Sequence, residues 1–244
     1  MRVLVVTAVP VERDAVTRAF TDGPQILDVP GAELHRAGAF DVVAGGAGPA
    51  SAAAAAAFAL ASGAGAGVGP GAGAGPYDLV VSAGIGGGFA PDAPVGSLVV
   101  ASGIVAADLG AETPDGFVPV TDLGFGRERF LPPPDLVRDV AAATGALTGE
   151  VLTVSTVTGS AGRAAALRTA HPQAVAEAME GFGVAEAAER LRVPVLEIRA
   201  VSNAVGPRDR NAWRIGDALA ALTEAFGKLT PVLEGWTTPH DRHR

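Results

Sequence analysis

Five short segments carry groups that could do chemistry, and each follows a run of apolar residues. Each segment is rich in Gly, Ser, Thr or an acid, and they cover residues 9–12, 45–48, 82–89, 155–160 and 202–207. Apolar runs of this length predict buried strands, and ligands of open α/β sheets bind beyond the carboxyl ends of the strands. We therefore expect the five segments to meet on one face of the protein and to form a site there.

Two glutamates stand where an expected strand meets an expected helix: Glu12, and Glu180 directly after Met179. Carboxylates are among the groups that transfer protons in catalysis. A simpler interpretation is that each acid stabilises a helix N-terminus, where negative charge is favourable. Neither glutamate decides between the two interpretations by itself.

The cluster AGIGGG, residues 83–88, is the densest group of glycines that follows a predicted strand. It lacks the Lys-Ser/Thr pair of a P-loop, and it does not lie on the first strand–helix turn, where dinucleotide-binding glycines are found. Two interpretations stay open. The glycines let the backbone approach a sugar or a base closely, or they form a tight turn after the strand.

Several chemistries are not indicated by the sequence. The chain has no Cys, which excludes disulfides and Cys-bound metals. Its four His residues do not have the spacing of metal ligands, and there is no G-x-S-x-G elbow for acyl transfer. We expect neither a metal nor a cofactor.

Length and charge limit the class of protein further. The 244 residues suit one large α/β domain, and the net charge of −8 argues against nucleic acid or an anionic membrane as the main partner. Acidic residues arrive too early for a signal peptide, and no run approaches the roughly 20 apolar residues of a membrane span. We expect a soluble, cytoplasmic protein with one domain over residues 1–234, a Gly/Ala-rich insertion at 63–76 and a flexible tail at 235–244.

Predicted strands and helices alternate along the chain, which favours an α/β fold with a mostly parallel sheet between helices. The strands are expected at residues 2–8, 31–35, 40–45, 77–82, 96–107, 150–157 and 193–202. The helices are expected at residues 11–20, 50–61, 132–144, 160–170, 181–191 and 211–233.

Taken together, the motifs resemble a known superfamily. The segments MRVLVVTAVPVERDAV, GGAGPASAAAA, VVSAGIGGGF, GSLVVAS, AEAMEGFGVAEAA and VLEIRAVSN occur in this order. They resemble the purine nucleoside phosphorylases and nucleosidases, with the spacing of the methylthioadenosine/S-adenosylhomocysteine nucleosidase branch. The ERDA start, the MEGFGVA helix and SNAVGPRDR resemble the futalosine hydrolase family of the menaquinone pathway most closely.

The resemblance covers residues 1–233 apart from the glycine-rich insertion. It implies a three-layer fold, in which a central mixed, mostly parallel sheet with a barrel-like part is flanked by helices. It also implies a homo-oligomer, a dimer or larger.

The resemblance also implies roles for three residues. Glu12 would activate the attacking water, Met179 would pack beneath the ribose, and Glu180 would bind the ribose hydroxyls. These roles suit the chemistry, because cleavage of an N-glycosidic bond passes through an oxocarbenium-like sugar. One carboxylate can orient and deprotonate a water, and a second can stabilise the developing positive charge.

Asn203 departs from the adenine-specific branch, which carries Asp at this position. An acid can protonate N7 of adenine, whereas an amide offers N–H donors and a C=O acceptor, which suits N7 or O6 of a 6-oxopurine. We therefore expect Asn203 to take part in catalysis by selecting hypoxanthine. The simpler interpretation is that Asn203 caps the loop before Pro207.

Other residues are expected to contact the substrate: Ser82, Ala83, Gly84 and Thr158. The benzoate of futalosine would need a cation or a hydroxyl, for which Arg208 and Arg210 are candidates, with Trp213 as an apolar wall. The simpler interpretation is that both arginines are solvated surface residues.

We expect hydrolysis of futalosine to hypoxanthine and dehypoxanthinylfutalosine. Hydrolysis is favoured over phosphorolysis because no Arg stands beside residues 80–84 to hold phosphate. Three alternatives stay open: a methylthioadenosine-type nucleosidase, an inosine phosphorylase and a non-catalytic nucleoside-binding module. Asn203 argues against the first, the missing arginine against the second, and the retention of both Glu12 and Glu180 against the third.

Overall fold

The computed structural model describes residues 1–29, 31–62 and 77–236. The insertion expected at 63–76 and most of the expected tail, residues 237–244, lie outside these ranges. The described strands are β1 (Val3–Thr7), β2 (Gln25–Val29), β3 (Ala32–Ala37), β4 (Phe40–Ala44), β5 (Leu79–Gly88), β6 (Leu98–Ala106), β7 (Gly110–Thr113), β8 (Gly116–Pro119), β9 (Arg129–Phe130), β10 (Leu147–Thr153), β11 (Ala174–Ala178) and β12 (Val195–Ala204). The described helices are α1 (Pro10–Thr17), α2 (Pro49–Ser62), α3 (Pro134–Thr144), α4 (Ala161–Ala170), α5 (Gly181–Arg190) and α6 (Ile215–Gly235).

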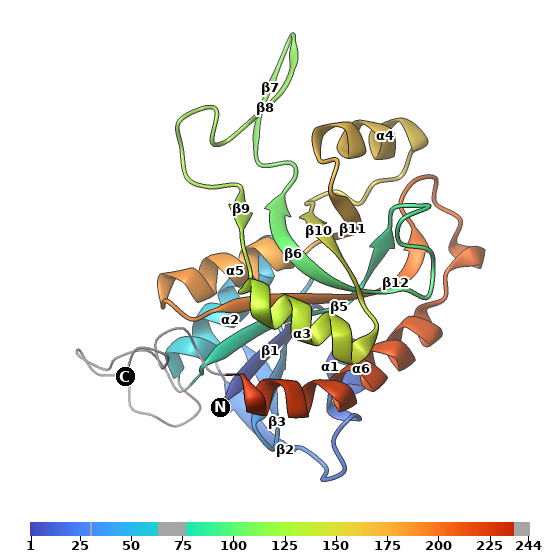
Figure 1. The fold of residues 1–244 in the computed structure, drawn as a ribbon. Coiled ribbons are helices and arrows are strands. Elements are labelled where there is room, and N and C mark those ends of the chain that lie inside the picture. Colours follow the sequence, from blue (N-terminus) through green and yellow to red (C-terminus); the bar gives the residue numbers. More distant parts are fainter. Residues whose placement is uncertain (30, 63–76, 237–244) are drawn as a thin grey trace.

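One large mixed sheet organises the chain (Figure 1). Its strand order is β11-β10-β6-β12-β5-β1-β4-β3-β2, and β11 also pairs with β5. This second pairing joins β11, β10, β6, β12 and β5 into a closed ring, while β1 to β4 extend the sheet beyond it. The expected mixed sheet with a barrel-like part is confirmed.

The sheet contains more antiparallel strand pairs than we expected for a mostly parallel sheet. β1 pairs in parallel with β4 on one side and with β5 on the other. The pairs β5–β12, β6–β10 and β10–β11 are also parallel. Antiparallel pairs close the ring at β12–β6 and β11–β5, and the hairpins through β2, β3 and β4 form an antiparallel edge. The sequence did not indicate β2, and this is one source of the difference.

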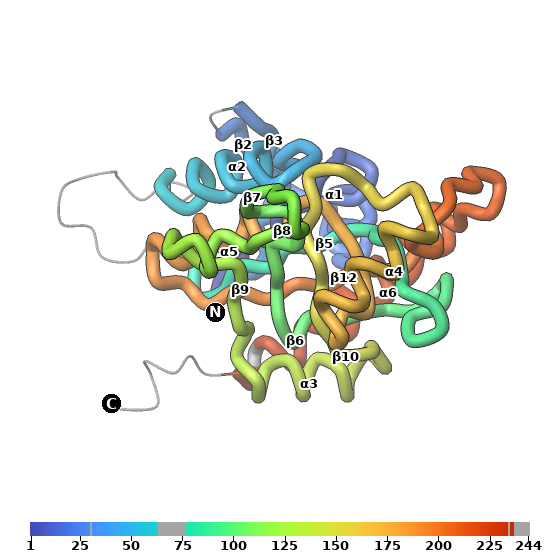
Figure 2. Tube along the Cα trace, turned by 90° about the horizontal axis from the view of Figure 1, so that it is seen from above, coloured from blue at the N-terminus to red at the C-terminus, as the bar shows by residue number. Residues whose placement is uncertain are grey.

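Helices cover both faces of the sheet, and the strands supply alternate side chains to each face. In β1, Leu4 and Val6 belong to the core beneath α2 and α5, whereas Val3 and Val5 belong to the core beneath α1, α3 and α6. This alternation explains why β1 is apolar throughout. Figure 1 shows α2 beside α5 and α3 beside α6, and Figure 2 shows α2 and α3 on opposite sides of the molecule.

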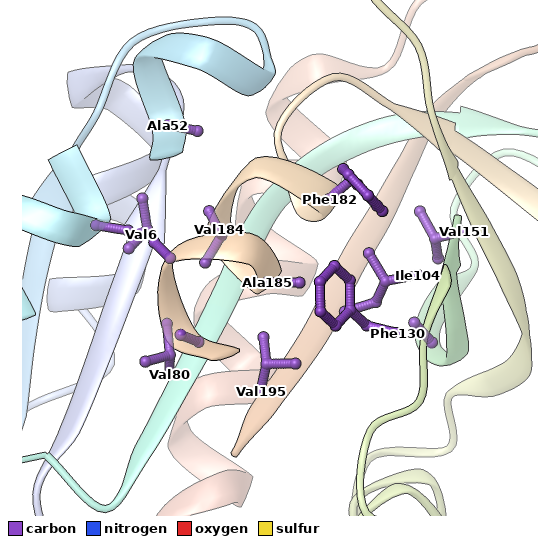
Figure 3. Close-up of a cluster of buried hydrophobic side chains, with 14 of the residues drawn as sticks. Val6, Ala52, Val80, Ile104, Phe130, Val151, Phe182, Val184, Ala185 and Val195 are labelled. Atoms are coloured by element: carbon purple, nitrogen blue, oxygen red, sulfur yellow. The ribbon is translucent and has the colours of Figure 1, made fainter. Parts of the chain in front are cut away.

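Helix α5 is buried along most of its length, and this fixes the position of its N-terminus. Figure 3 shows Val184 facing Val6 and Val80, while Phe182 faces Ile104 and Phe130. The rings of Phe182 and Phe130 lie 5.2 Å apart, centroid to centroid. Glu180 precedes this helix directly, so the packing of α5 determines where that carboxylate stands.

Two strands end later than expected, in ways that concern the site. β5 continues to Gly88, so the AGIGGG cluster is strand, and the tight-turn interpretation is wrong. β12 continues to Ala204 with a register shift between Val201 and Asn203. Such a bulge redirects side chains at the end of a strand, so Asn203 belongs to the strand and the capping interpretation is wrong.

The last helix also differs from its expected range. α6 begins at Ile215, after a short 3-10 helix at Arg210–Ala212, and it ends at Gly235. Trp236 is buried, so the first two residues of the expected flexible tail are ordered.

Candidate functional site

A cavity of about 210 Å³ opens at the ends of β5, β11 and β12, beside the start of α1 and the loop after β10. Its lining residues are Ala8, Glu12, Ile85, Gly86, Gly87, Val157, Thr158, Glu177, Ala178, Met179, Glu180, Ser202, Asn203, Val205 and Trp213. Four of the five expected segments contribute to this wall. The fifth contributes Gly48, whose N–H binds Glu180.

Glu12 is buried at the first turn of α1, with only 3% of its surface exposed. Its Oε2 accepts hydrogen bonds from the N–H groups of Ala8 (2.9 Å) and Val9 (3.2 Å), and its Oε1 accepts one from Ile85 (2.9 Å). Burial raises the pKa of Glu12, against the opposing effects of the Ile85 N–H and of Arg199. Glu12 therefore caps the helix, as the simpler interpretation holds, and is at the same time a more basic carboxylate fixed in the cavity wall.

Glu180 is held mainly by groups outside its own helix. Its Oε2 lies 3.1 Å from Nη1 of Arg199, and its Oε1 accepts a hydrogen bond of 3.2 Å from the Gly48 N–H. The side chain makes no capping hydrogen bond to α5. The helix-capping interpretation therefore does not account for Glu180, whereas an ion-paired carboxylate facing the cavity does.

Arg199 lies behind this wall and joins the acidic groups into one cluster. It is completely buried, with its Nε 2.9 Å from Oε1 of Glu197 and its Nη2 2.9 Å from Oγ of Ser82. Burial alone lowers the pKa of Arg199, but Glu197, Glu180 and Glu12 together raise it. One permanent cation thus stands among three buried carboxylates.

Burial and the excess of carboxylates over cations affect the pKa of Glu197 most clearly. It is completely buried, and burial raises its pKa to about 6 although Arg199 acts in the opposite direction. Its second oxygen, Oε2, has no hydrogen-bond partner among the described residues. Protonation of Glu197 therefore relieves the surplus of negative charge in the cluster.

Glycines of β5 make room for the cluster. A Cβ at Gly84 would lie 2.6 Å from Oε1 of Glu12 and 2.8 Å from Nη1 of Arg199. At Gly84 the close approach is thus to the protein's own charged side chains, whereas Gly86 and Gly87 line the cavity. Ser82, Ala83 and Gly84 do not line the cavity, and Ser82 instead binds Arg199.

Thr158 lines the cavity and is fixed by a residue that the sequence did not indicate, Glu177. Glu177 accepts hydrogen bonds from the Thr158 N–H (2.8 Å) and from its hydroxyl. Both side chains are nearly inaccessible, at 3% and 4% exposure. Ser160, by contrast, caps α4, where its hydroxyl accepts a hydrogen bond from the Arg163 N–H.

Asn203 lies beside the glycines of β5, opposite Gly87. Its Oδ1 accepts a hydrogen bond of 2.8 Å from the hydroxyl of Ser202, and its Nδ2 donates one of 3.1 Å to the carbonyl of Ala204. The amide is therefore oriented with its nitrogen free to donate its second hydrogen. A base in the cavity would meet an N–H donor here.

The comparisons with known proteins agree with this site. Residues 32–233 match the model of the phosphorylase superfamily. The chain is 66% identical over 243 residues to a futalosine hydrolase of Streptomyces coelicolor, which covers 99% of this chain and 100% of that protein. This chain belongs to the futalosine hydrolase family of the phosphorylase superfamily.

Further relatives extend the comparison. A futalosine hydrolase of Acidothermus cellulolyticus is 42% identical over 231 residues, 93% of this chain and 89% of that protein. The structure of a futalosine hydrolase of Helicobacter pylori has a TM-score of 0.77 at 16% identity, covering 95% of this chain and 98% of that one. A methylthioadenosine/S-adenosylhomocysteine nucleosidase of Colwellia psychrerythraea, in complex with adenine, has a TM-score of 0.76 at 23% identity, covering 94% and 96%. These structural matches confirm the fold expected from the resemblance.

Three residues of this futalosine hydrolase family member were not expected at the site: Arg199, Glu197 and Glu177. Hydrolysis was expected because no Arg stands beside residues 80–84 in the sequence. This reason is wrong, because Arg199 is paired in register with Gly84 on the neighbouring strand. The signal was present as two charges in the otherwise apolar run VLEIRAV. Charged residues are rarely buried unless they are paired, so a pair at i and i+2 on one face of a strand could have been noticed.

Arg208 lies at the rim of the site and does not line it. Its guanidinium stands 5.3 Å from the ring centroid of Trp213, and that of Arg210 stands 5.9 Å away. Trp213 lines the cavity, while both arginines are exposed. Their placement is compatible with either of the two interpretations of these arginines.

The raised pKa of Glu197 predicts a pH dependence of stability. A carboxyl group whose pKa rises from 4.5 to about 6 on folding stabilises the fold fully below about pH 4.5, and this contribution is lost as the pH rises through about 6. The size is on the order of 2 kcal/mol. In Glu197→Gln, whose amide oxygen can still accept from Arg199, the free energy of unfolding should fall less between about pH 4.5 and pH 7.5 than in the wild type.

Urea unfolding at the two pH values measures this difference. The control is Glu224→Gln, an exposed partner of Lys228, which should keep the pH dependence of the wild type. Equal pH dependence in Glu197→Gln and the wild type would contradict the prediction.

Proposed function

We propose that this chain hydrolyses the N-glycosidic bond of futalosine, releasing hypoxanthine and dehypoxanthinylfutalosine for menaquinone biosynthesis. The observation that carries the proposal is the single cavity in which Glu12, Met179, Glu180 and Asn203 meet. These residues come from three distant parts of the chain. Membership of the futalosine hydrolase family supports the choice of substrate.

Glu12 and Glu180 have different environments, which suit different tasks. Glu12 has a raised pKa and three backbone donors, so it is fixed in place and basic enough to take a proton from water. Glu180 is paired with Arg199 and remains an acceptor for the ribose hydroxyls. Met179 supplies an apolar contact beneath the sugar.

Water is a more suitable nucleophile here than phosphate. The described residues that line the cavity include three glutamates, Glu12, Glu177 and Glu180, and neither Lys nor Arg. Arg199 is completely buried behind them and already bound to Glu197, Glu180 and Ser82. A phosphate dianion would be repelled by this wall, whereas a sugar with oxocarbenium character would be stabilised by it.

The leaving base would be held by Asn203. Its free amide hydrogen can bind N7 or O6 of hypoxanthine and so stabilise the charge that develops on the base. At the sugar's 5′ side, Trp213 offers an apolar wall and Arg208 a cation for the benzoate. We assign binding of the benzoate to Arg208 together with Arg210, although neither arginine lines the cavity.

We also propose that the chain works in the cytoplasm as a homo-oligomer, dimer or larger. Among the described residues, no helix combines the length and apolar character that a membrane span requires. Large apolar side chains are exposed along the segment that contains β7 and β8, namely Leu109, Phe117, Leu123, Phe125 and Leu131. Contact between copies of the chain would cover such side chains.

The test of the proposed function is release of hypoxanthine from futalosine, followed by chromatography with and without phosphate. The wild type should release hypoxanthine at the same rate in both conditions. Glu12→Gln, which cannot accept a proton from water, should reduce kcat by a factor of about 10² to 10⁴. Because the pKa of Glu12 is raised, kcat/KM of the wild type should fall with decreasing pH at a pH above the ordinary glutamate value of 4.5.

The control for this prediction is Glu186→Gln, in the middle of α5 and away from the cavity, which should keep wild-type kinetics. A requirement for phosphate would reject hydrolysis. Full activity of Glu12→Gln would reject Glu12 as the base.

Asn203→Asp tests the choice of base. The aspartate can still accept the Ser202 hydroxyl, but it replaces the amide donor with an acid that can protonate N7 of adenine. We expect kcat/KM for futalosine to fall by a factor of about ten or more, and activity on methylthioadenosine to appear. Asn211→Asp, at an exposed position, should change neither activity. A variant that gains no activity on adenine nucleosides would count against a selecting role of Asn203.

The double variant Arg208→Ala, Arg210→Ala tests the benzoate assignment. Loss of the cations should raise KM for futalosine by a factor of about ten, while KM for inosine, which has no benzoate, should stay within about twofold. Arg138→Ala, on the exposed face of α3, serves as the control. Unchanged KM for futalosine would leave the arginines as surface residues.

A further inference from the structure

Glu177 is a buried carboxylate in the cavity wall that the proposed hydrolysis does not use. Both of its oxygens are bound by one residue, with Oε1 accepting from the Thr158 N–H at 2.8 Å and Oε2 from the Thr158 hydroxyl. Both residues line the cavity. The two come from different elements, because Glu177 lies in β11 and Thr158 in the loop between β10 and α4.

This pairing fixes the polarity of the Thr158 hydroxyl. A hydroxyl has one hydrogen to donate and two lone pairs that accept. Since the hydrogen is donated to Glu177, the Thr158 side chain can present only acceptor lone pairs to the cavity. The ionised Glu177 carboxylate likewise only accepts. This part of the wall is therefore an acceptor surface.

The acceptor surface lies across a strand from Asn203. Glu177 of β11 and Asn203 of β12 are both in register with Gly87 of β5, which lies between them. A Cβ at Gly87 would stand 2.9 Å from Cγ2 of Val205 and 3.3 Å from Nδ2 of Asn203, so these two side chains occupy the space that a side chain at position 87 would take. Val205 and Gly87 line the same cavity as the donor and the acceptors.

We propose that Thr158, held by Glu177, accepts a hydrogen bond from N1–H of a 6-oxopurine and so selects against 6-aminopurines. A 6-oxopurine has a donor at N1 and acceptors at O6 and N7, which is complementary to acceptors at Thr158 and a donor at Asn203. Adenine has a lone pair at N1, which would face the lone pairs of Thr158. Glu177 is a positioning residue, because it acts through the hydroxyl that it orients.

This inference rests on the proposed function for the identity of the base, but it concerns a different step, the recognition of the base. A site built to bind an N–H group discriminates strongly against an analogue that lacks it. The burial of Glu177 and Thr158 strengthens this discrimination, because an unpaired acceptor there would have no water to replace the lost partner.

The test is calorimetric binding of free bases to the full chain, which does not depend on cleavage. The probes are hypoxanthine, adenine and 1-methylhypoxanthine, in which a methyl group replaces the hydrogen on N1. The wild type should bind hypoxanthine at least about tenfold more tightly than either of the others. Thr158→Val should lose this preference, and Thr158→Ser, which keeps the hydroxyl, should retain it.

Glu177→Gln is the variant that separates orientation from simple support. Its amide can donate to the Thr158 hydroxyl oxygen, which turns the hydroxyl hydrogen toward the cavity, where N1 of adenine can accept it. The ratio of hypoxanthine to adenine affinity should therefore fall by a factor of about ten or more. If Glu177 only supported the loop, its loss would weaken the binding of both bases equally. Thr156→Val, exposed in the same loop, is the matched control.

Ratios within about twofold of the wild type in both Thr158→Val and Glu177→Gln would overturn the inference, as would a wild type that does not prefer hypoxanthine. If Glu177→Gln does not fold, the affinities of Thr158→Val and Thr158→Ser for the bases still test the inference. A chain that prefers hypoxanthine but does not cleave futalosine would reject the proposed function and leave this inference standing. A chain that cleaves futalosine but does not prefer hypoxanthine would support the proposed function and reject this inference.

Discussion

The ion-pair cluster around Arg199 is the interaction on which the rest of the site depends. A buried guanidinium can be stable only if carboxylates compensate its charge, and here Glu197 and Glu180 do so directly. Without the cation, three buried carboxylates would lie near one another without compensation. The cluster is therefore the reason why Glu12 and Glu180 can both stand buried in the wall of one cavity.

The architecture follows from the need to accommodate this cluster inside a sheet. Arg199 is at the centre of β12 and points toward β5, where only a glycine at position 84 leaves enough room for it and for Glu12. Gly181, at the start of α5, leaves room for the Glu197 carboxylate in the same way. Gly84 and Gly181 are needed because charged side chains occupy the space that side chains at these two positions would take.

Much of the fold could be predicted from the sequence because it depends on local patterns. The apolar run of β1 and the periodicity of α5 are of this kind, and so are the acids at strand–helix boundaries. The need for a glycine at position 84 could not be inferred in the same way. The side chain that requires it, Arg199, lies on β12, more than a hundred residues away. The two charges of β12 are a local signal of a buried pair, but the position of Arg199 beside Gly84 depends on strand pairing, which no local pattern reports. The bulge that directs Asn203 likewise depends on register, which no run of residue types encodes.

The different environments of the two site carboxylates explain how residues of the same type can act differently. Glu12 is bound by neutral N–H groups and has a raised pKa, so it can take up a proton and release it again. Glu180 is instead paired with a permanent cation, Arg199, at 3.1 Å. Pairs of titratable groups in contrasting environments are the arrangement that separates a base from an electrostatic partner. Arg199 contributes to both environments, because it lies 3.1 Å from Glu180 and its charge opposes the rise in the pKa of Glu12 that burial causes. The position of one buried cation is thus consistent with the two roles that we propose, deprotonation of water by Glu12 and binding of the sugar by Glu180.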